Sequence, residues 1–193
     1  YSAMIISAPD SADLLQAASW SVTDSLPYDS TYLDGKFGAW LEGNAVVTPD
    51  GNVADLLRVD YAPGPEYAAL IRLRDSVSFD PFDPEKDFVR MPGGAKKFTV
   101  RYDSLSGRYW SLVNYVTQEW AGKQNPAWVR NTLALSSSPN LQEWTVHRTV
   151  LHHPDIAKHG FQYADWLFDG NDIVLLSRTA YDDNGTGAHN CHD

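Results

Sequence analysis

Short apolar blocks separated by tight-turn residues recur along most of this chain of 193 residues. Four units share this pattern, at residues 40–61, 97–116, 131–150 and 161–181. Their turns are Asp50-Gly51, Ser106-Gly107, Pro139-Asn140 and Asp169-Gly170. Apolar strands joined by Gly, Asn or Asp turns are typical of β-hairpins. The pattern therefore predicts an all-β protein with four hairpins, whose turns lie about 30 to 55 residues apart.

Apolar residues often occupy both faces of these strands, as in the consecutive run of residues 173–176. A sheet that is buried on both sides produces such runs, and the stacked blades of a β-propeller are sheets of this kind. We favour a propeller over the alternative of a two-layer sandwich. Residues 10–18 form the best helix candidate, although they could equally be a turn, and residues 76–94 predict a long surface loop because they are rich in Pro, Asp and Gly.

Nothing in the pattern divides residues 1–193, so we treat them as one propeller domain. A propeller closes a ring of typically four to eight blades, each with four strands. The hairpins and the opening segment supply about four blades. We therefore expect the C-terminal part of a longer, six-bladed propeller, whose open blade faces could associate.

Fifteen basic and twenty-five acidic residues give a formal charge of −10, which argues against a nucleic-acid partner. No apolar run reaches the roughly 18 residues that a membrane span needs. A single cysteine, Cys191, excludes an internal disulfide framework. Near the C-terminus, His189, His192 and Asp193 could ligate a cation, but a polar loop is the commoner explanation. We expect no metal and no cofactor.

Opposite charges stand at the open end of the first hairpin, where Glu42 opens one strand and Arg58 closes the next. A cross-strand ion pair is the simplest interpretation, and at a surface it contributes about 0.2 to 1 kcal/mol. Similarly, Arg130 alone could be a surface residue, and Tyr163 alone a packed aromatic residue. Only the ordered set of four favours a functional interpretation.

The segment SSSPNLQEWTV, which contains Asn140 and Trp144, resembles a degenerate Asp-box, the turn found on the blades of sialidases. Asn140 stands where the box usually has Asp. The order of four residues also resembles the sialidase pattern of a Glu, two arginines and a Tyr near the starts or ends of successive strands: Glu42, Arg58, Arg130 and Tyr163. A sialidase site also contains a third arginine and an acid/base Asp, and no equivalent of either precedes Glu42.

The resemblance implies that Tyr163 is the nucleophile and that Glu42 accepts its proton, while Arg58 and Arg130 hold the substrate carboxylate. Arginine forks bind carboxylates by charge-assisted hydrogen bonds. A neutral phenol also suits an anionic sugar better than a carboxylate nucleophile would, and sialidases are known to use Tyr. Three further residues complete the predicted substrate site: Trp40, Gln162 and Asp165.

The function expected from this resemblance is a sialidase-like glycoside hydrolase that removes a terminal acidic sugar from a glycan. Two alternatives stay open, because a propeller can carry different chemistries. One is a polysaccharide lyase acting on uronate-containing glycans, and the other is a non-catalytic carbohydrate-binding propeller. A secreted or periplasmic location is expected, although residues 1–15 lack the basic start and long apolar core of a signal peptide.

Overall fold

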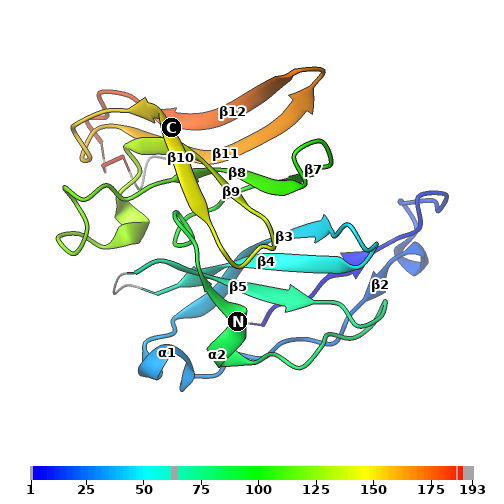
Figure 1. Cartoon of the computed structure of the whole chain (residues 1–193). Coiled ribbons are helices and arrows are strands. Elements are labelled where there is room, and N and C mark those ends of the chain that lie inside the picture. The colour runs from blue at the N-terminus through cyan, green and yellow to red at the C-terminus, as the bar shows by residue number, and fades with distance from the viewer. Residues whose placement is uncertain (1, 62–64, 186, 189–193) are drawn as a thin grey trace.

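The computed structural model describes residues 2–61, 65–185 and 187–188, and this part of the chain is an all-β fold (Figure 1). Four antiparallel sheets contain all its strands: β1-β2, β3-β4-β5-β6, β7-β8-β9-β10 and β11-β12. The helical elements are short: η1 (Ala17–Ser19), α1 (Tyr32–Gly35), α2 (Pro84–Asp87) and η2 (Pro126–Trp128). No helix in the described residues is long and apolar enough to cross a membrane.

The first four-stranded sheet is an antiparallel meander. Its strands are β3 (Ala39–Val47), β4 (Val53–Asp60), β5 (Tyr67–Arg72) and β6 (Phe88–Arg90). Gly51 adopts a φ of +83° in the turn between β3 and β4, a conformation that glycine reaches without steric cost. This confirms the predicted first hairpin.

The second four-stranded sheet is also a meander. Its strands are β7 (Val100–Asp103), β8 (Arg108–Asn114), β9 (Thr132–Ser138) and β10 (Thr145–His152). In the Asp-box-like turn, Asn140 Oδ1 accepts hydrogen bonds from the backbone amides of Gln142 and Glu143, at 3.0 and 2.9 Å. The second and third predicted hairpins therefore form, but they join into one sheet, so hairpins do not correspond one to one with sheets.

Two smaller sheets complete the fold. One is the predicted fourth hairpin, formed by β11 (Gly160–Asp169) and β12 (Asp172–Ala180). The other pairs β1 (Ile6–Ser7) with β2 (Ser21–Val22). The candidate helix at residues 10–18 is mostly turns and coil, since only η1 reaches into it, at its last two residues.

The sheets are stacked in layers, so both faces of each four-stranded sheet carry buried side chains (Figure 1). Leu56 and Leu70 of the first sheet share a core cluster with Tyr109 and Val113 of the second. On the far side of the second sheet, Leu112 and Leu133 pack with Ala164 and Trp166 of β11. The other face of the first sheet is covered by an aromatic cluster that includes Phe37 and Phe88. These layers explain the apolar residues on both faces of the strands.

The first strands of successive sheets lie side by side. The side chain of Asn44 in β3 hydrogen-bonds the backbone of Val100 in β7 in both directions, at 2.8 and 3.2 Å. Just before β7, Thr99 donates to the carbonyl of Ala164 in β11 at 3.2 Å and accepts from Trp166 Nε1 at 2.9 Å. Polar contacts between first strands therefore fix the order β3, β7, β11 across the molecule.

The predicted surface loop at residues 76–94 is partly wrong. Its second half contains α2 and β6, and Val89 and Met91 are buried in the core shared by the two large sheets. Gly94 packs so closely on the first sheet that a Cβ there would lie 2.5 Å from the carbonyl oxygen of Tyr67. Composition suggested a loop, but pairing with β5 makes part of this segment an edge strand.

Candidate functional site

The predicted pair at the open end of the first hairpin forms. Arg58 Nη1 donates to both carboxylate oxygens of Glu42, at 3.0 and 3.2 Å. Arg58 Nε donates to the carbonyl of Ala95 at 2.9 Å. The side chain of Arg58 is 14% exposed and that of Glu42 is 40% exposed. The guanidinium is thus held from two sides and largely enclosed, which a simple surface ion pair does not require.

A β-bulge places Glu42 beside Arg58. Trp40 pairs with Val59 and Gly43 with Leu57, so β3 advances three residues while β4 advances two. The extra residue interrupts the alternation of side chains. A bulge of the same size occurs in β11, between Gln162 and Asp165.

Arg130 is buried, not exposed as an isolated arginine would be. It follows η2, where Pro126 stands at the first helical turn and Asn125 accepts a hydrogen bond from the amide of Ala127. Arg130 Nε donates to the carbonyl of Ala127 at 2.9 Å, and Nη1 donates to Gln162 Oε1. The cap and the carbonyl together orient the guanidinium toward β11.

Tyr163 lies in the β11 bulge with a φ of +52°, in the left-handed region that bulky residues seldom adopt. Such strain costs about 1 to 3 kcal/mol and is often found at functional sites. The ring centroid lies 4.4 Å from the guanidinium carbon of Arg178 and 5.9 Å from that of Arg130. Two cations therefore flank the tyrosine, and in the described residues no hydrogen bond joins it to Glu42.

Gln162 connects the two arginines that flank Tyr163. Its side chain is fully buried, and its Oε1 accepts from Arg130 Nη1 and from Arg178 Nη2, the latter at 2.9 Å. Its Nε2 donates to the carbonyl of Ala188. The prediction that Gln162 contacts substrate is therefore corrected: the side chain has no exposed surface, and it positions the two guanidiniums.

Two other predicted substrate contacts lie elsewhere. Trp40 is 3% exposed, its ring stacks on Phe88, and its Nε1 donates to the carbonyl of Pro27 at 3.0 Å. It is a core residue with no free ring face for a sugar, so this prediction is wrong. Asp165 is exposed and pairs with Arg101 at 3.5 Å, and among the residues that the structure describes no hydrogen bond or ion pair joins it to the arginines around Tyr163.

Arg178 was not identified from the sequence. It lies near the end of β12, in register with Gln162, so it closes the return strand of its hairpin much as Arg58 closes β4. That parallel is the signal that could have found it. Its Nε is buried and, in the part of the chain that the structure describes, has no hydrogen-bond acceptor.

The arginines and Lys96 form one electrostatic cluster, which we call the cationic cluster: Arg58, Lys96, Arg130 and Arg178. Burial lowers the pKa of Arg130, the nearby Tyr163 raises it, and the charges of Arg58 and Arg178 lower it again. Burial also lowers the pKa of Lys96, while Glu66 raises it and Arg130 and Arg58 lower it. With Glu42 and Glu66 as the paired carboxylates, four cations stand against two anions.

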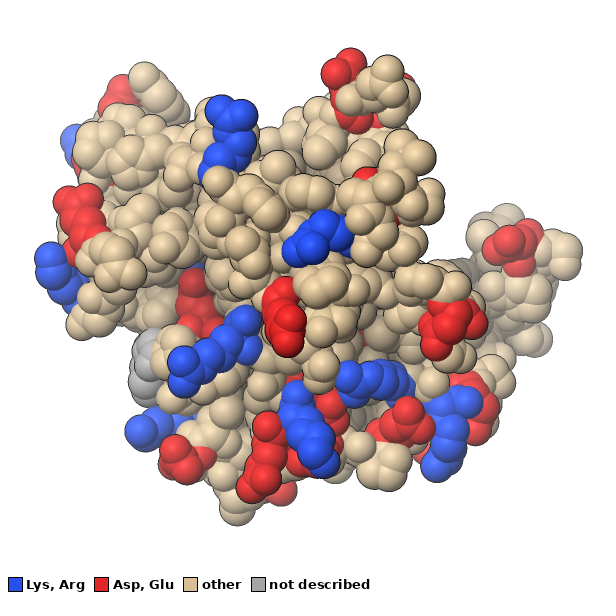
Figure 2. Space-filling view, viewed as in Figure 1, with Lys and Arg blue, Asp and Glu red and all other residues tan. Residues whose placement is uncertain are grey.

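This local excess of positive charge contrasts with the protein as a whole, which has a formal charge of −10. On the face shown in Figure 2, Lys and Arg side chains are interspersed with Asp and Glu instead of forming one basic patch. The cationic cluster is therefore suited to a small anion, not to an extended polyanion.

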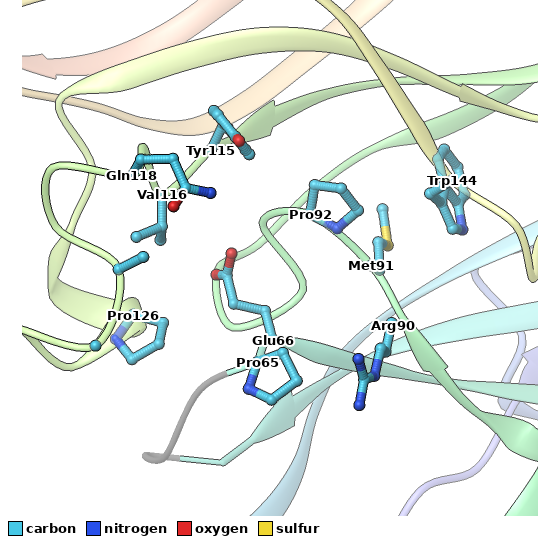
Figure 3. Close-up of a pocket in the computed structure, with 12 residues that line it drawn as sticks. Pro65, Glu66, Arg90, Met91, Pro92, Tyr115, Val116, Gln118, Pro126 and Trp144 are labelled. Atoms are coloured by element: carbon cyan, nitrogen blue, oxygen red, sulfur yellow. The ribbon is translucent and has the colours of Figure 1, made fainter.

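A cavity of about 390 Å³ lies beside Glu66 and Pro126 (Figure 3). Glu66 and Pro126, which both hydrogen-bond Lys96, line it together with Met91, Tyr115 and Trp144. Its volume lies in the range of small-molecule pockets. None of the three arginines lines this cavity.

Two histidines of the C-terminal third contact each other and a neighbouring loop. His153 and His159 stack with their centroids 3.4 Å apart, and His159 Nε2 lies 3.1 Å from Asp182. No group of three or more His, Cys, Asp or Glu side chains in the described residues is arranged to hold a metal ion. The candidate ligands His189, His192 and Asp193 lie outside the described residues.

The sequence matches no model of a known protein family and no curated protein sequence.

Proposed function

We propose that this chain is part of a sialidase-like glycoside hydrolase that acts on a sugar carrying a carboxylate. The observation that carries the proposal is the setting of Tyr163. It lies in a strained β-bulge with two guanidiniums against its ring, and one of them, Arg130, also interacts electrostatically with Arg58 and Lys96 from distant parts of the chain. This arrangement combines an anion-binding cluster with a nucleophile.

Arg130 is buried and Arg58 and Arg178 are half-buried. Guanidiniums this close to one another repel, so an anion that binds among them gains more free energy than it would at an exposed site. Arg178 has an unused hydrogen-bond donor, because its buried Nε has no acceptor in the described residues. A buried unsatisfied donor costs about 1 to 3 kcal/mol. We propose that one carboxylate of the substrate is held by Arg58, Arg130 and Arg178. Three arginines is the number that the sialidase resemblance leads us to expect.

We also propose that the fold is a partial β-propeller. Two four-stranded meanders, each covered on both faces, succeed one another with their first strands side by side, as blades do around a common axis. The outer face of the β11-β12 hairpin carries exposed apolar side chains at Leu167, Val174 and Leu176. We propose that further blades cover such faces in the complete ring.

In the proposed reaction, Tyr163 Oη bonds to the anomeric carbon as the bond to the leaving oxygen breaks, and water then cleaves the tyrosyl intermediate. Positive charge beside the phenol stabilises the oxygen as it loses its proton. Glu42 becomes a stronger base for that proton when Arg58 releases it, because both its oxygens accept hydrogen bonds from that guanidinium. We propose that the substrate carboxylate replaces Glu42 on Arg58.

A lyase on uronate-containing glycans is the second candidate, and one observation favours it. The immediate partners of Tyr163 are cations and not a carboxylate base, so the tyrosine could itself remove a proton next to a neutralised uronate. Product analysis separates the two reactions, since a lyase releases an unsaturated sugar that absorbs ultraviolet light and a hydrolase does not.

The test uses 4-methylumbelliferyl glycosides of N-acetylneuraminic acid, glucuronic acid and galactose. Their aryl oxygen leaves as a phenolate and needs no acid, so turnover reports on the nucleophile. We expect release from an acidic glycoside but not from the galactoside. Tyr163→Phe should reduce release to background. Tyr102→Phe is the control, because that ring packs on Tyr109 at the core shared by the two large sheets. No release from any glycoside, or equal turnover by wild type and Tyr163→Phe, would contradict the hydrolase.

A further inference from the structure

Lys96 occupies an unusual position for a lysine. It is 1% exposed, and its Nζ donates to Glu66 Oε1 and, at 2.9 Å, to the carbonyl of Pro126. The second oxygen of Glu66 accepts from the amide of Gly93 at 2.9 Å. Lysine is seldom fully buried unless it is paired, and here the pair is itself almost completely enclosed. This ion pair needs a physical explanation.

Stability alone explains it poorly. Removing both charges from water costs several kcal/mol, and well-packed apolar residues of similar size often stabilise a protein as much or more. Burial is the main cause that lowers the pKa of Lys96; Glu66 raises it, and the neighbouring Arg130 and Arg58 lower it to a smaller extent. An ammonium that loses its hydration is thus an unfavourable way to fill this space.

The backbone around Lys96 suggests what the pair does. Ala95, directly before Lys96, provides the carbonyl that holds Arg58 Nε at 2.9 Å. Ala127, directly after Pro126, provides the carbonyl that holds Arg130 Nε at 2.9 Å. Lys96 therefore joins the two backbone segments that orient the two guanidiniums.

Each segment also has contacts of its own. Residues 93–94 lie against Tyr67 at the start of β5 and against Val113 and Asn114 of β8, and Glu66 anchors the amide of Gly93. The η2 turn is capped by Asn125 from within its own segment. The ammonium of Lys96 is the side-chain group that bonds to both Glu66 and Pro126, and so spans the distance from one segment to the other.

We propose that Lys96 is a positioning residue: with Glu66, it fixes the separation of Arg58 and Arg130 so that both guanidiniums can bind one carboxylate. This inference rests on the proposed role of the arginines, and it adds the requirement that their spacing is set by a buried ion pair. The chemical class recognised is a sugar acid, and Lys96 does not itself contact the ligand.

The decisive variant is Lys96→Met combined with Glu66→Met, which removes both charges and leaves neither partner buried alone. If the pair serves only stability, this variant should bind ligand as the wild type does once it is folded. If Lys96 positions the arginines, the variant should fold but lose discrimination between N-acetylneuraminic acid and its uncharged methyl ester. We expect the acid-to-ester ratio of affinities, measured by calorimetry, to fall by about tenfold, as for the loss of one charge-assisted hydrogen bond.

Controls separate this inference from the proposed function. Arg72→Met breaks a different ion pair, with buried Asp87 at 2.7 Å, and should keep the ratio. Arg58→Met should lower the acid-to-ester ratio of affinities. If Arg58→Met lowers this ratio and the double variant keeps the wild-type ratio, positioning by Lys96 is refuted while the arginine site stands. If the wild type shows no preference for the acid, the proposed function fails and this inference fails with it.

A second measurement needs no ligand and also covers poor folding of the double variant. The Nε–H resonances of Arg58 and Arg130 report the two hydrogen bonds to Ala95 and Ala127. In the single variant Lys96→Met, but not in Arg72→Met, both resonances should shift toward the position of solvated arginine. Resonances that stay at their wild-type positions would overturn the inference.

Discussion

Replacing Asp55 by Asn should stabilise the protein at neutral pH. Asp55 lies in the middle of β4 and is 5% exposed. Its Oδ1 has no hydrogen-bond partner in the described residues, although the backbone amide of Asn44 donates to the carboxyl group. Its carboxylate also packs closely on Gly43, where an added Cβ would lie 2.6 Å from the nearer oxygen. Burial without a cation raises the pKa of Asp55 from 3.8 to about 6.

The direction in which stability changes with pH follows from proton binding. The folded state holds the Asp55 proton more tightly than the unfolded state does, so stability falls as pH rises from about 4 through about 6. A shift of about two units corresponds to about 3 kcal/mol, at about 1.4 kcal/mol for each unit. Asparagine carries no charge, so Asp55→Asn escapes this loss. The bond from the amide of Asn44 becomes weaker without the charge, by about 1 kcal/mol. A net gain of about 2 kcal/mol should result at pH 7.

Urea unfolding at pH 4, 5, 6 and 7 measures the effect directly. The two proteins should have similar free energies of unfolding at pH 4 and diverge as pH rises. Asp50→Asn is the opposite control: Asp50 is exposed, and hydrogen bonds from Thr48 and then Asn52 lower its pKa. That variant should be less stable than wild type at pH 7, with the difference fading as pH falls through the lowered pKa. A free-energy difference for Asp55→Asn that does not vary with pH, or a loss of stability at pH 7, would refute the reasoning.

Three other predictions follow from local geometry. Gly94→Ala should lower the free energy of unfolding, measured in urea, by about 1 to 3 kcal/mol. The new Cβ would lie 2.5 Å from the backbone of Tyr67, and neither backbone segment can move freely. Asn140→Asp should raise the melting temperature at pH 7 but not at pH 3, since an ionised oxygen is the stronger acceptor for the two turn amides that it already binds. Leu176→Lys should reduce self-association in sedimentation experiments, because Leu176 is 78% exposed on the outer face of β12; an unchanged sedimentation profile from a self-associating wild type would contradict this.

The hairpins could be predicted from the sequence because their turns are encoded locally. Gly51, Gly107 and Gly170 have φ values of +83°, +63° and +60°, which glycine adopts without strain. A tight turn between apolar blocks leaves little choice other than an antiparallel pair. Three of the four hairpins form for this reason, and in the third the Asn140 side chain holds the turn. All four hairpins and the all-β fold are confirmed.

Strands that pair over longer distances could not be predicted in the same way. β5 has no tight turn to its partner β6, and the register that joins Ala68 to Val89 spans a segment rich in Pro and Asp. β6 has only three residues and becomes a strand because an edge of the sheet is free to pair with it. Its sequence alone resembles a loop, and only the assembled sheet supplies the hydrogen bonds that make it a strand.

The site was only partly predictable. Arg130 and Tyr163 were named together from the sialidase resemblance, and they lie together in the structure. Trp40 was chosen because aromatic rings bind sugars, but large aromatic residues also fill cores, and here the core contains it. The sialidase resemblance predicts a third arginine before Glu42, whereas the chain places Arg178 near the end of the last hairpin.

Two similar β-bulges explain why the alternation of residues along the strands could not predict this site. In a straight strand Glu42 would face the same side as Trp40, toward the aromatic cluster, while Arg58 faces the other large sheet. The extra residue in β3 turns the Glu42 carboxylate to the side of Arg58.

In β11, adjacent residues should point to opposite faces, yet the Gln162 amide and the Tyr163 ring both contact Arg178. The left-handed backbone of Tyr163 makes that possible. Both bulges lie at the open end of a hairpin and insert one residue in its first strand, and each brings a side chain to an arginine on the return strand. Bulges that re-aim side chains in this way are common beside functional sites, and alternation counted along the sequence cannot reveal them. The same interruption that hides Glu42 and Tyr163 from a periodicity argument therefore brings them into contact with the arginines.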